Sequence, residues 1–147
     1  LDRGFVLTID YGHTAQDLYR SDRKGGTLLC YSQQSVNDNP FLRVGDQDMT
    51  AHVDFSCLAA TGEEQGLQTT GFTNQMSFLM GLGVEQMIAK LEQDSPEFNA
   101  AIHLLRPNGM GTTFKVLIQH KGLARPELDG LQYKPFFGSA LTTQSAA

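Results

Sequence analysis

The sequence predicts an α/β fold organised around one strand near its start. The residues from Phe5 to Ile9 are all apolar or β-branched, and Thr8 is the only polar one among them. Such a run lacks the alternation of apolar and polar residues that marks a strand with one solvent-exposed face. It therefore predicts a strand buried on both faces, as in a parallel sheet covered by helices. Helix signals then separate this strand from two later ones, an order typical of α/β proteins.

Two helices have clear local signals. The segment 54–65 predicts a helix, with Asp54 as its N-cap and Gly66 as its C-terminal stop. Ser95–Glu97 begins a second helix that runs to Leu105, because serine caps, proline suits the first helical position and an early acid favours the helix dipole. The other predicted elements are strands at Thr27–Tyr31, Leu67–Thr73 and Thr112–His120, and helical segments at Gln75–Leu82 and Val84–Gln93.

The composition is that of a soluble globular protein. The 147 residues suffice for one domain, expected over 1–122, with a tail over 123–147 that is partly docked or flexible. The net charge of −5, from 16 acidic against 11 basic residues, gives no basic footprint for nucleic acid. No apolar stretch has the length of a membrane span, and no signal peptide is evident. Cys30 and Cys57 lie in apolar surroundings, which favours two buried free thiols and a cytoplasmic location.

Two further features concern the surroundings of the first strand. The chain enters this strand within three residues of Leu1, and buried parallel strands need neighbours on both edges. We therefore expect the chain to be part of a larger protein with strands before Leu1. The segment 32–48 contains a strong turn signal at Asn37–Pro40 and predicts a long loop, which in a compact domain is usually functional or structured by a partner.

Acid and imidazole groups gather in two places, residues 10–13 (Asp-Tyr-Gly-His) and His52-x-Asp54. The first follows the buried strand, at the edge of an open α/β sheet where ligands bind. A carboxylate that ends a buried run should be hydrogen-bonded or have a perturbed pKa, so Asp10 is a candidate functional residue. Asp54 also has an ordinary interpretation as an N-cap. A metal site would use ligand types that a divalent ion accepts, although no dense metal motif is present; its ligands would be Asp10, His13, His52 and Asp54.

Serine nucleophile chemistry has little support in the sequence. There is no Gly-x-Ser-x-Gly elbow, and Ser56 and Ser77 lie within predicted helices. The segments Gly81–Gly83 and Gly109–Gly111 are short fragments of a nucleotide-binding pattern and predict caps and turns. The chain alone therefore contains no complete catalytic apparatus.

Three segments form a pattern that extends over about Gly4 to Lys121. They are residues 4–13 (GFVLTIDYGH), residues 48–55 (DMTAHVDF) and residues 71–83 with Thr73, Gln75, Phe78 and Leu79. Together, and in this order, they resemble the MidA family of S-adenosylmethionine-dependent methyltransferases, as do Asn39-Pro40 and Met110-Gly111. This family includes the mitochondrial complex I assembly arginine methyltransferase.

The resemblance implies a Rossmann-like class I methyltransferase sheet with helical insertions, of which this chain is the C-terminal part. The strand at Gly4–Asp10 would be the fifth, Leu67–Thr73 the sixth and Thr112–His120 the seventh, the last one antiparallel. The cofactor of the complete enzyme would be S-adenosylmethionine, and the reaction protein (arginine) N-methylation. The glycine-rich loop, the acidic end of the second strand and the fourth strand are absent from this sequence, so the isolated chain is expected to be inactive.

The resemblance also implies which residues line the substrate side of the cleft. The catalytic candidates are Asp10, Tyr11 and His13, and the substrate-binding candidates are Thr50, His52, Asp54 and Phe55. Two alternatives stay open: a non-catalytic module that binds a partner, and a metal-dependent hydrolase. If the remainder of the sheet is missing, the uncovered first strand would favour a homodimer, through Phe5, Val6, Leu7 and Ile9.

Overall fold

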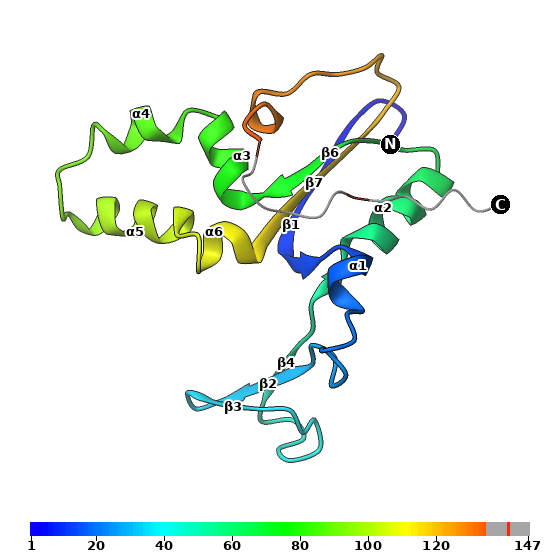
Figure 1. Cartoon of the computed structure of the whole chain (residues 1–147), viewed down its shortest axis with the longest axis vertical. Coiled ribbons are helices and arrows are strands. Elements are labelled where there is room, and N and C mark those ends of the chain that lie inside the picture. The colour runs from blue at the N-terminus through cyan, green and yellow to red at the C-terminus, as the bar shows by residue number, and fades with distance from the viewer. Residues whose placement is uncertain (135–140, 142–147) are drawn as a thin grey trace.

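The computed structural model describes residues 1–134 and 141, and its centre is a mixed four-stranded sheet (Figure 1). The strand order is β5-β1-β7-β6. β1 pairs in parallel with β5, whereas β7 is antiparallel to both β1 and β6. The strands are β1 (Gly4–His13), β5 (Val53–Asp54), β6 (Gln68–Asn74) and β7 (Phe114–Lys121).

The antiparallel pairing of β7 with β1 and β6 agrees with the antiparallel last strand that the family resemblance implied. Connections of this length are compatible with parallel pairing throughout, but the chain reverses between β6 and β7. Leu117 lies opposite Thr8 on one side and opposite Phe72 on the other. The last strand therefore enters between two strands that run parallel to each other, and the carboxyl ends of β1 and β6 flank the start of β7.

The helices begin where the sequence predicts caps. Asp54 accepts a hydrogen bond from the Cys57 amide at the start of α2, and Ser95 accepts one from the Phe98 amide at the start of α5. The helix predicted over Val84–Gln93 is shorter in the structure, where it ends at Ile88. The helices are α1 (Ala15–Leu18), α2 (Phe55–Glu64), α3 (Gln75–Gly81), α4 (Val84–Ile88), α5 (Pro96–Leu105), α6 (Met110–Thr113) and the 3₁₀ turn η1 (Asp129–Leu131).

The core lies between α2 and one face of the sheet. Phe55, Ala59 and Leu117 are completely buried there, and the rings of Phe55 and Phe72 are 5.3 Å apart. The Gln119 amide donates a hydrogen bond of 2.9 Å to the Ala59 carbonyl, which ties the helix to β7. α4 and α5 form a pair of helices that projects from the other end of the sheet (Figure 1).

β1 is not buried on both faces, contrary to the sequence prediction. It pairs with β7 from Gly4 to Tyr11, but its other edge meets β5 only at Gly12 and His13. Its apolar side chains consequently remain accessible, and Leu7 is 52% exposed. Phe5, Val6 and Ile9 are exposed as well.

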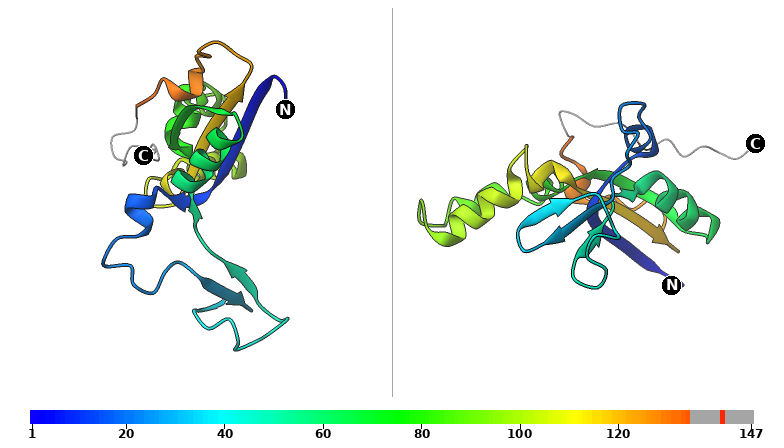
Figure 2. Two further views of the ribbon diagram at one scale, coloured as in Figure 1. Left: turned by 90° about the vertical axis from the view of Figure 1, so that its right-hand side faces the viewer. Right: turned by 90° about the horizontal axis from the view of Figure 1, so that it is seen from below.

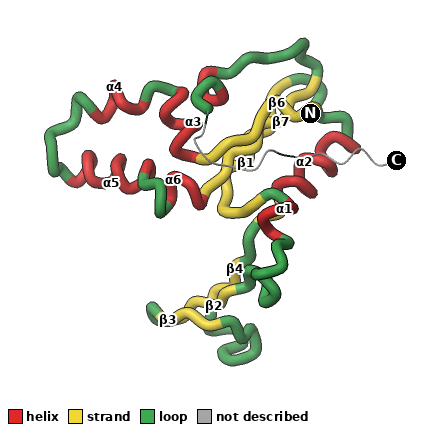
Figure 3. Tube along the Cα trace, in the orientation of Figure 1, coloured by secondary structure: helices red, strands yellow, loops and turns green. Residues whose placement is uncertain are grey.

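A second, three-stranded sheet stands apart from the first and is called the arm below. It consists of β2 (Leu29–Ser32), β3 (Ser35–Asn37) and β4 (Asp48–Thr50), in the order β3-β2-β4. The arm extends away from the main sheet in Figure 1 and in the left view of Figure 2. The segment predicted as one long loop over 32–48 thus contains a strand, and what remains is a two-residue turn at 33–34 and the loop between β3 and β4 (Figure 3).

Three smaller expectations can be compared with the structure. Both cysteines are free, but only Cys30 is buried, since Cys57 is exposed on α2. The 3₁₀ turn η1 packs on β6 and α3, because Leu131 contacts Gly71 and Gly130 contacts the ring of Phe78. Phe136 and Phe137 lie outside the described residues. No helix in the described part of the chain has the length and apolarity needed to cross a membrane.

Candidate functional site

The pairing of β1 with β5 brings the two acid and imidazole motifs together. Gly12 lies opposite Val53, and His13 lies opposite Asp54, although some forty residues separate the strands along the chain. The contact is at the carboxyl end of β1, which is the edge at which α/β sheets bind ligands. The segment after β1 is also fastened to α2, because the Ala15 amide donates to Ser56 Oγ at 3.0 Å.

Aromatic and imidazole rings form a continuous cluster at this edge. The ring centroids of His13 and His52 are 4.9 Å apart, and those of Tyr11 and His52 are 5.8 Å apart. Tyr11 also packs edge-on against Phe114 at 5.8 Å, across the pairing of β1 with β7. Tyr11 and His13 lie on the same side of β1 because strand side chains alternate, so one face of the edge carries a phenol and two imidazoles.

Gly12 is required for this arrangement. A Cβ atom at this position would lie 2.3 Å from the Val53 carbonyl oxygen and 2.8 Å from the ring of Phe55. The absence of a side chain therefore allows β5 and the first residue of α2 to approach β1 closely. The glycine of the Asp-Tyr-Gly-His motif has a packing role, while its neighbours carry the polar groups.

The imidazoles are held in their neutral form. Burial, followed by the charge of Arg23, lowers the pKa of His13 from 6.5 to about 4, with further contributions from His52 and Lys115 and an opposing one from Asp17. Burial and then Arg23 also lower the pKa of His52. At neutral pH both rings are therefore uncharged, and each can accept a hydrogen bond.

Two cations beside these rings were not predicted from the sequence. Burial lowers the pKa of the Lys115 amine, and this lysine lies opposite Asp10 in the register of β1 with β7. Arg23 lines a cavity of about 410 Å³ formed by the segment after α1. Among the described residues, Arg23 Nη1 and His52 Nδ1 are buried without a hydrogen-bond partner, so both are available to a bound group.

The other candidates from the sequence have different surroundings. Asp10 accepts a hydrogen bond of 2.8 Å from the Tyr11 amide and is partly exposed. Asp54 acts as the N-cap of α2 through its 3.0 Å contact with the Cys57 amide. Thr50 is the last residue of β4 and pairs with Leu29 in the arm. Phe55 has no exposed surface and belongs to the core.

Neither a metal site nor a complete cofactor site is formed by these residues. Within residues 1–134 and 141, no group of three or more His, Cys, Asp or Glu side chains is placed to hold a metal ion. The hydrolase hypothesis, which needs Asp10, His13, His52 and Asp54 as ligands, is therefore not supported. The amides at the start of α2 and α3 are capped by the chain's own Asp54 and Asn74, so neither helix offers the open glycine-rich turn that nucleotide-type cofactors use.

The fold and this edge together define a class of protein. The mixed α/β fold of this chain resembles two solved structures, one of which is described as a "likely methyl transferase". Residues 1–73 match the model of a family described as "Putative S-adenosyl-L-methionine-dependent methyltransferase". The chain belongs to this family, which confirms the family resemblance predicted from the sequence.

Three relatives support this membership. The chain is 30% identical over 135 residues to "Protein arginine methyltransferase NDUFAF7 homolog, mitochondrial" of Drosophila melanogaster, a match that covers 87% of this chain and 29% of that protein. An uncharacterized protein from Burkholderia thailandensis superposes with a TM-score of 0.81 at 33% identity, over 88% of this chain and 36% of that one. A structure from the same species, bound to S-adenosyl-homocysteine, superposes with a TM-score of 0.78 at 33% identity, over 86% and 34%. The chain thus spans about a third of the length of these relatives.

Proposed function

We propose that this chain is the substrate-side part of a S-adenosylmethionine-dependent methyltransferase that N-methylates a protein, at arginine. The observation that carries the proposal is the carboxyl edge of β1, where Tyr11 and His13 lie beside His52 and Asp10 precedes them on the same strand. The family membership supplies the reaction class, and the name of the fly relative supplies the protein arginine substrate.

The proposal includes the place of these strands in a complete sheet. β1, β6 and β7 correspond to strands five, six and seven of a class I methyltransferase, which is supported by their order β1-β7-β6 and by the antiparallel β7. The groups that bind most of the cofactor then lie on strands outside this sequence. S-adenosylmethionine would supply the methyl group, and the 147 residues alone would be inactive.

Each residue of the edge has a role that its surroundings support. The partly exposed carboxylate of Asp10 would orient the substrate nitrogen and accept its proton. The phenol of Tyr11 would add a hydrogen bond and an apolar ring face. Because the pKa of His13 is lowered to about 4, its ring would stay neutral and accept a hydrogen bond from the substrate. Thr50, His52 and Asp54 would line the approach of the substrate, with Phe55 packed beneath.

Replacement of Asp10 by Asn in the complete enzyme tests this assignment. The amide keeps the shape and can still accept from the Tyr11 amide, but it cannot take a proton. We expect the rate of methyl transfer to fall by roughly 10²–10⁴-fold, the usual contribution of a positioned acid or base. Cofactor affinity should stay the same in calorimetry. Unchanged turnover would remove Asp10 from the chemistry.

Calorimetric titration of S-adenosylmethionine tests the proposal as a whole. The cofactor is titrated into the 147-residue chain and into a version extended upstream by the preceding coding sequence. We expect binding only by the extended version. Binding by the shorter chain would mean that the cofactor site is misplaced in this proposal, and binding by neither would favour the alternative below.

The second candidate is a non-catalytic module that binds a partner. It is favoured by the capped helix ends and by the exposed apolar face of β1, which could instead form a homodimer. A strand followed by Gly-x-Gly-x-Gly in the upstream coding sequence would support the enzyme. A cytoplasmic location is also part of the proposal and rests on the two free cysteines, although the fly relative is named as mitochondrial.

A further inference from the structure

We propose that the arm, residues 29–50, is a docking surface for the polypeptide that is to be methylated, and that it takes a segment rich in basic and apolar side chains. The identification of this polypeptide as the methyl acceptor rests on the proposed function. The existence of a docking surface rests on the arm itself.

The arm starts and ends at the candidate site. The chain leaves the main sheet after β1 and α1, forms β2, β3 and β4, and returns directly into β5 beside β1. Its two legs are joined at the root, where the His52 amide donates to Thr27 Oγ1 at 3.0 Å. A polypeptide bound along the arm would therefore be led to Tyr11, His13 and His52 (Figures 1 and 2).

The arm carries a set of apolar side chains that no part of the described chain covers. Phe41 is 83% exposed and Val44 is 77% exposed, both in the loop between β3 and β4. An aromatic side chain such as Phe41 can bury about 150–250 Å², and the aliphatic side chains of the set add to this area. A standard interface buries about 800 Å² per partner, so a substantial part of one could come from this set. Its members are Val36, Phe41, Leu42, Val44 and Met49.

The charges on the arm indicate the kind of partner. Asp38, Asp46 and Asp48 are exposed, whereas the only cation, Arg43, donates to Ser32 Oγ at 3.1 Å within the arm. The surface is therefore acidic as well as apolar. A second copy of this chain would bring the same negative charges, in addition to a net charge of −5, whereas a basic segment complements them.

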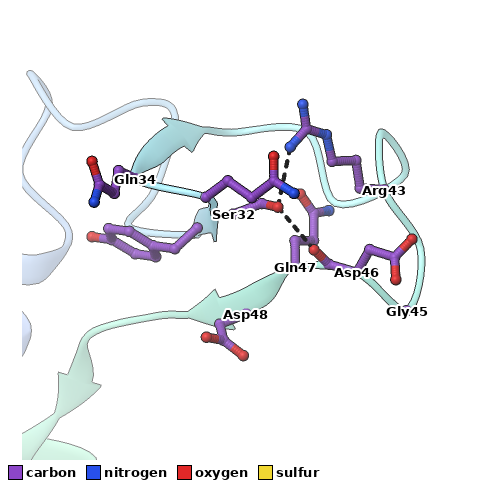
Figure 4. A pocket seen from close by; sticks show the side chains of 9 residues that line it. Ser32, Gln34, Arg43, Gly45, Asp46, Gln47 and Asp48 are labelled. Atoms are coloured by element: carbon purple, nitrogen blue, oxygen red, sulfur yellow. Dashed lines mark hydrogen bonds between the residues drawn. The ribbon is translucent and has the colours of Figure 1, made fainter.

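The arm also has open backbone edges. β3 and β4 each pair only with β2 among the described strands, so both can accept an added strand by main-chain hydrogen bonds. An open hollow of about 900 Å³ lies beside β2 and the β3–β4 loop (Figure 4). Its lining includes Gln34, Gln47, Asp46 and Asp48, which can bond the backbone or a cationic side chain of such a segment.

Fluorescence anisotropy with a defined peptide tests the docking surface. The probe is a labelled decapeptide of alternating arginine and valine, and the control peptide replaces each arginine by glutamate. We expect the 147-residue chain to bind the basic peptide, to bind it more weakly as salt rises, and to bind the acidic peptide at least tenfold more weakly.

Variants then locate the binding. We expect the double substitution Phe41→Ser and Val44→Ser, and separately Asp46→Asn with Asp48→Asn, to weaken peptide binding at least tenfold. Met87→Ser removes a side chain of similar exposure, 67%, from α4 and should leave binding unchanged. Circular dichroism and a cooperative urea transition establish that each variant is folded. Equal affinity for both peptides, or arm variants that bind like the wild type, would overturn the proposal.

Two further readouts separate this inference from the proposed function. Sedimentation that reveals a dimer dissociated by the arm substitutions would make the arm a contact between copies and would also overturn it. Cofactor binding by the extended chain does not depend on the arm. Peptide docking without cofactor binding would contradict the proposed function alone, and cofactor binding without peptide docking would contradict this inference alone.

Discussion

Gly12 is the residue at which the candidate site and the core meet. A Cβ atom there would overlap the Val53 carbonyl oxygen and the Phe55 ring, and backbone cannot move aside as a flexible side chain can. We expect Gly12→Ala to lower the free energy of unfolding by about 1–3 kcal/mol, the range for overpacking, as measured by urea denaturation. Gly25→Ala is the matched control, because a Cβ atom there has no neighbour within 4 Å. Equal stability of the two variants would contradict the close packing of β1 on β5.

His13 makes stability depend on pH in a defined window. The unfolded chain binds a proton on this residue near pH 6.5, whereas the folded chain does so only near pH 4. Stability is therefore unaffected by this group above pH 6.5 and falls as the pH drops toward 4. The groups that face the ring are Arg23, His52, Lys115 and, with the opposite sign, Asp17.

Comparison of His13→Gln with the wild type checks this dependence. The difference in unfolding free energy between the two should be constant above pH 6.5 and should shift in favour of the variant below it. Urea denaturation over a series of pH values measures it, and other titrating groups largely cancel in the difference. A difference that does not change with pH would mean that His13 is solvated in the folded protein.

At the level of elements, Asp54 has two candidate roles, as the N-cap of α2 and as a substrate-binding residue, and variants can distinguish them. Its carboxylate caps α2 through the Cys57 amide. We expect Asp54→Ala to cost about 1 kcal/mol of stability, and Asp54→Asn only a few tenths, because asparagine caps equally well. Thermal unfolding measures both. If Asp54→Asn preserves stability and also methyl transfer in the complete enzyme, the residue is a cap only; loss of stability in both variants would contradict the cap assignment.

The elements that the sequence predicted well are those fixed by local chemistry. Ser95 and Asp54 cap their helices through contacts only three residues away, and such contacts are visible in the sequence. β2 overlaps the strand predicted at Thr27–Tyr31, whereas β3 and β4 are only three residues long and pair with residues up to 21 positions away, so no periodicity marks them. The exposure of Leu7 depends on which strands pair with β1, and hydrophobicity alone does not report it.

For the molecule as a whole, the residues of the candidate site also divide into those that the local sequence indicates and those that only the folded structure brings together. Asp10, Tyr11 and His13 could be chosen because they end an apolar run and match a family motif. Arg23 and Lys115 could not, since one lies in an ordinary polar segment and the other within a strand. Only the register of β7 against β1 and the folding of the segment after α1 place these cations beside the imidazoles.

The open edge of β1 leads to the last prediction, which concerns association of the whole chain. From Gly4 to Tyr11, the side of this strand that faces away from β7 has no partner among the described residues, and its apolar side chains are exposed. An unprotected apolar edge promotes pairing with another chain, and a lysine in its middle blocks it. We expect the mass of the isolated chain in light scattering to rise with concentration toward a dimer, and Leu7→Lys to stay monomeric. Met87→Lys, on the exposed surface of α4, should dimerise like the wild type. A strictly monomeric wild type at high concentration would mean that this edge does not pair in solution. A dimer that survives Leu7→Lys would mean that the chains associate through another surface.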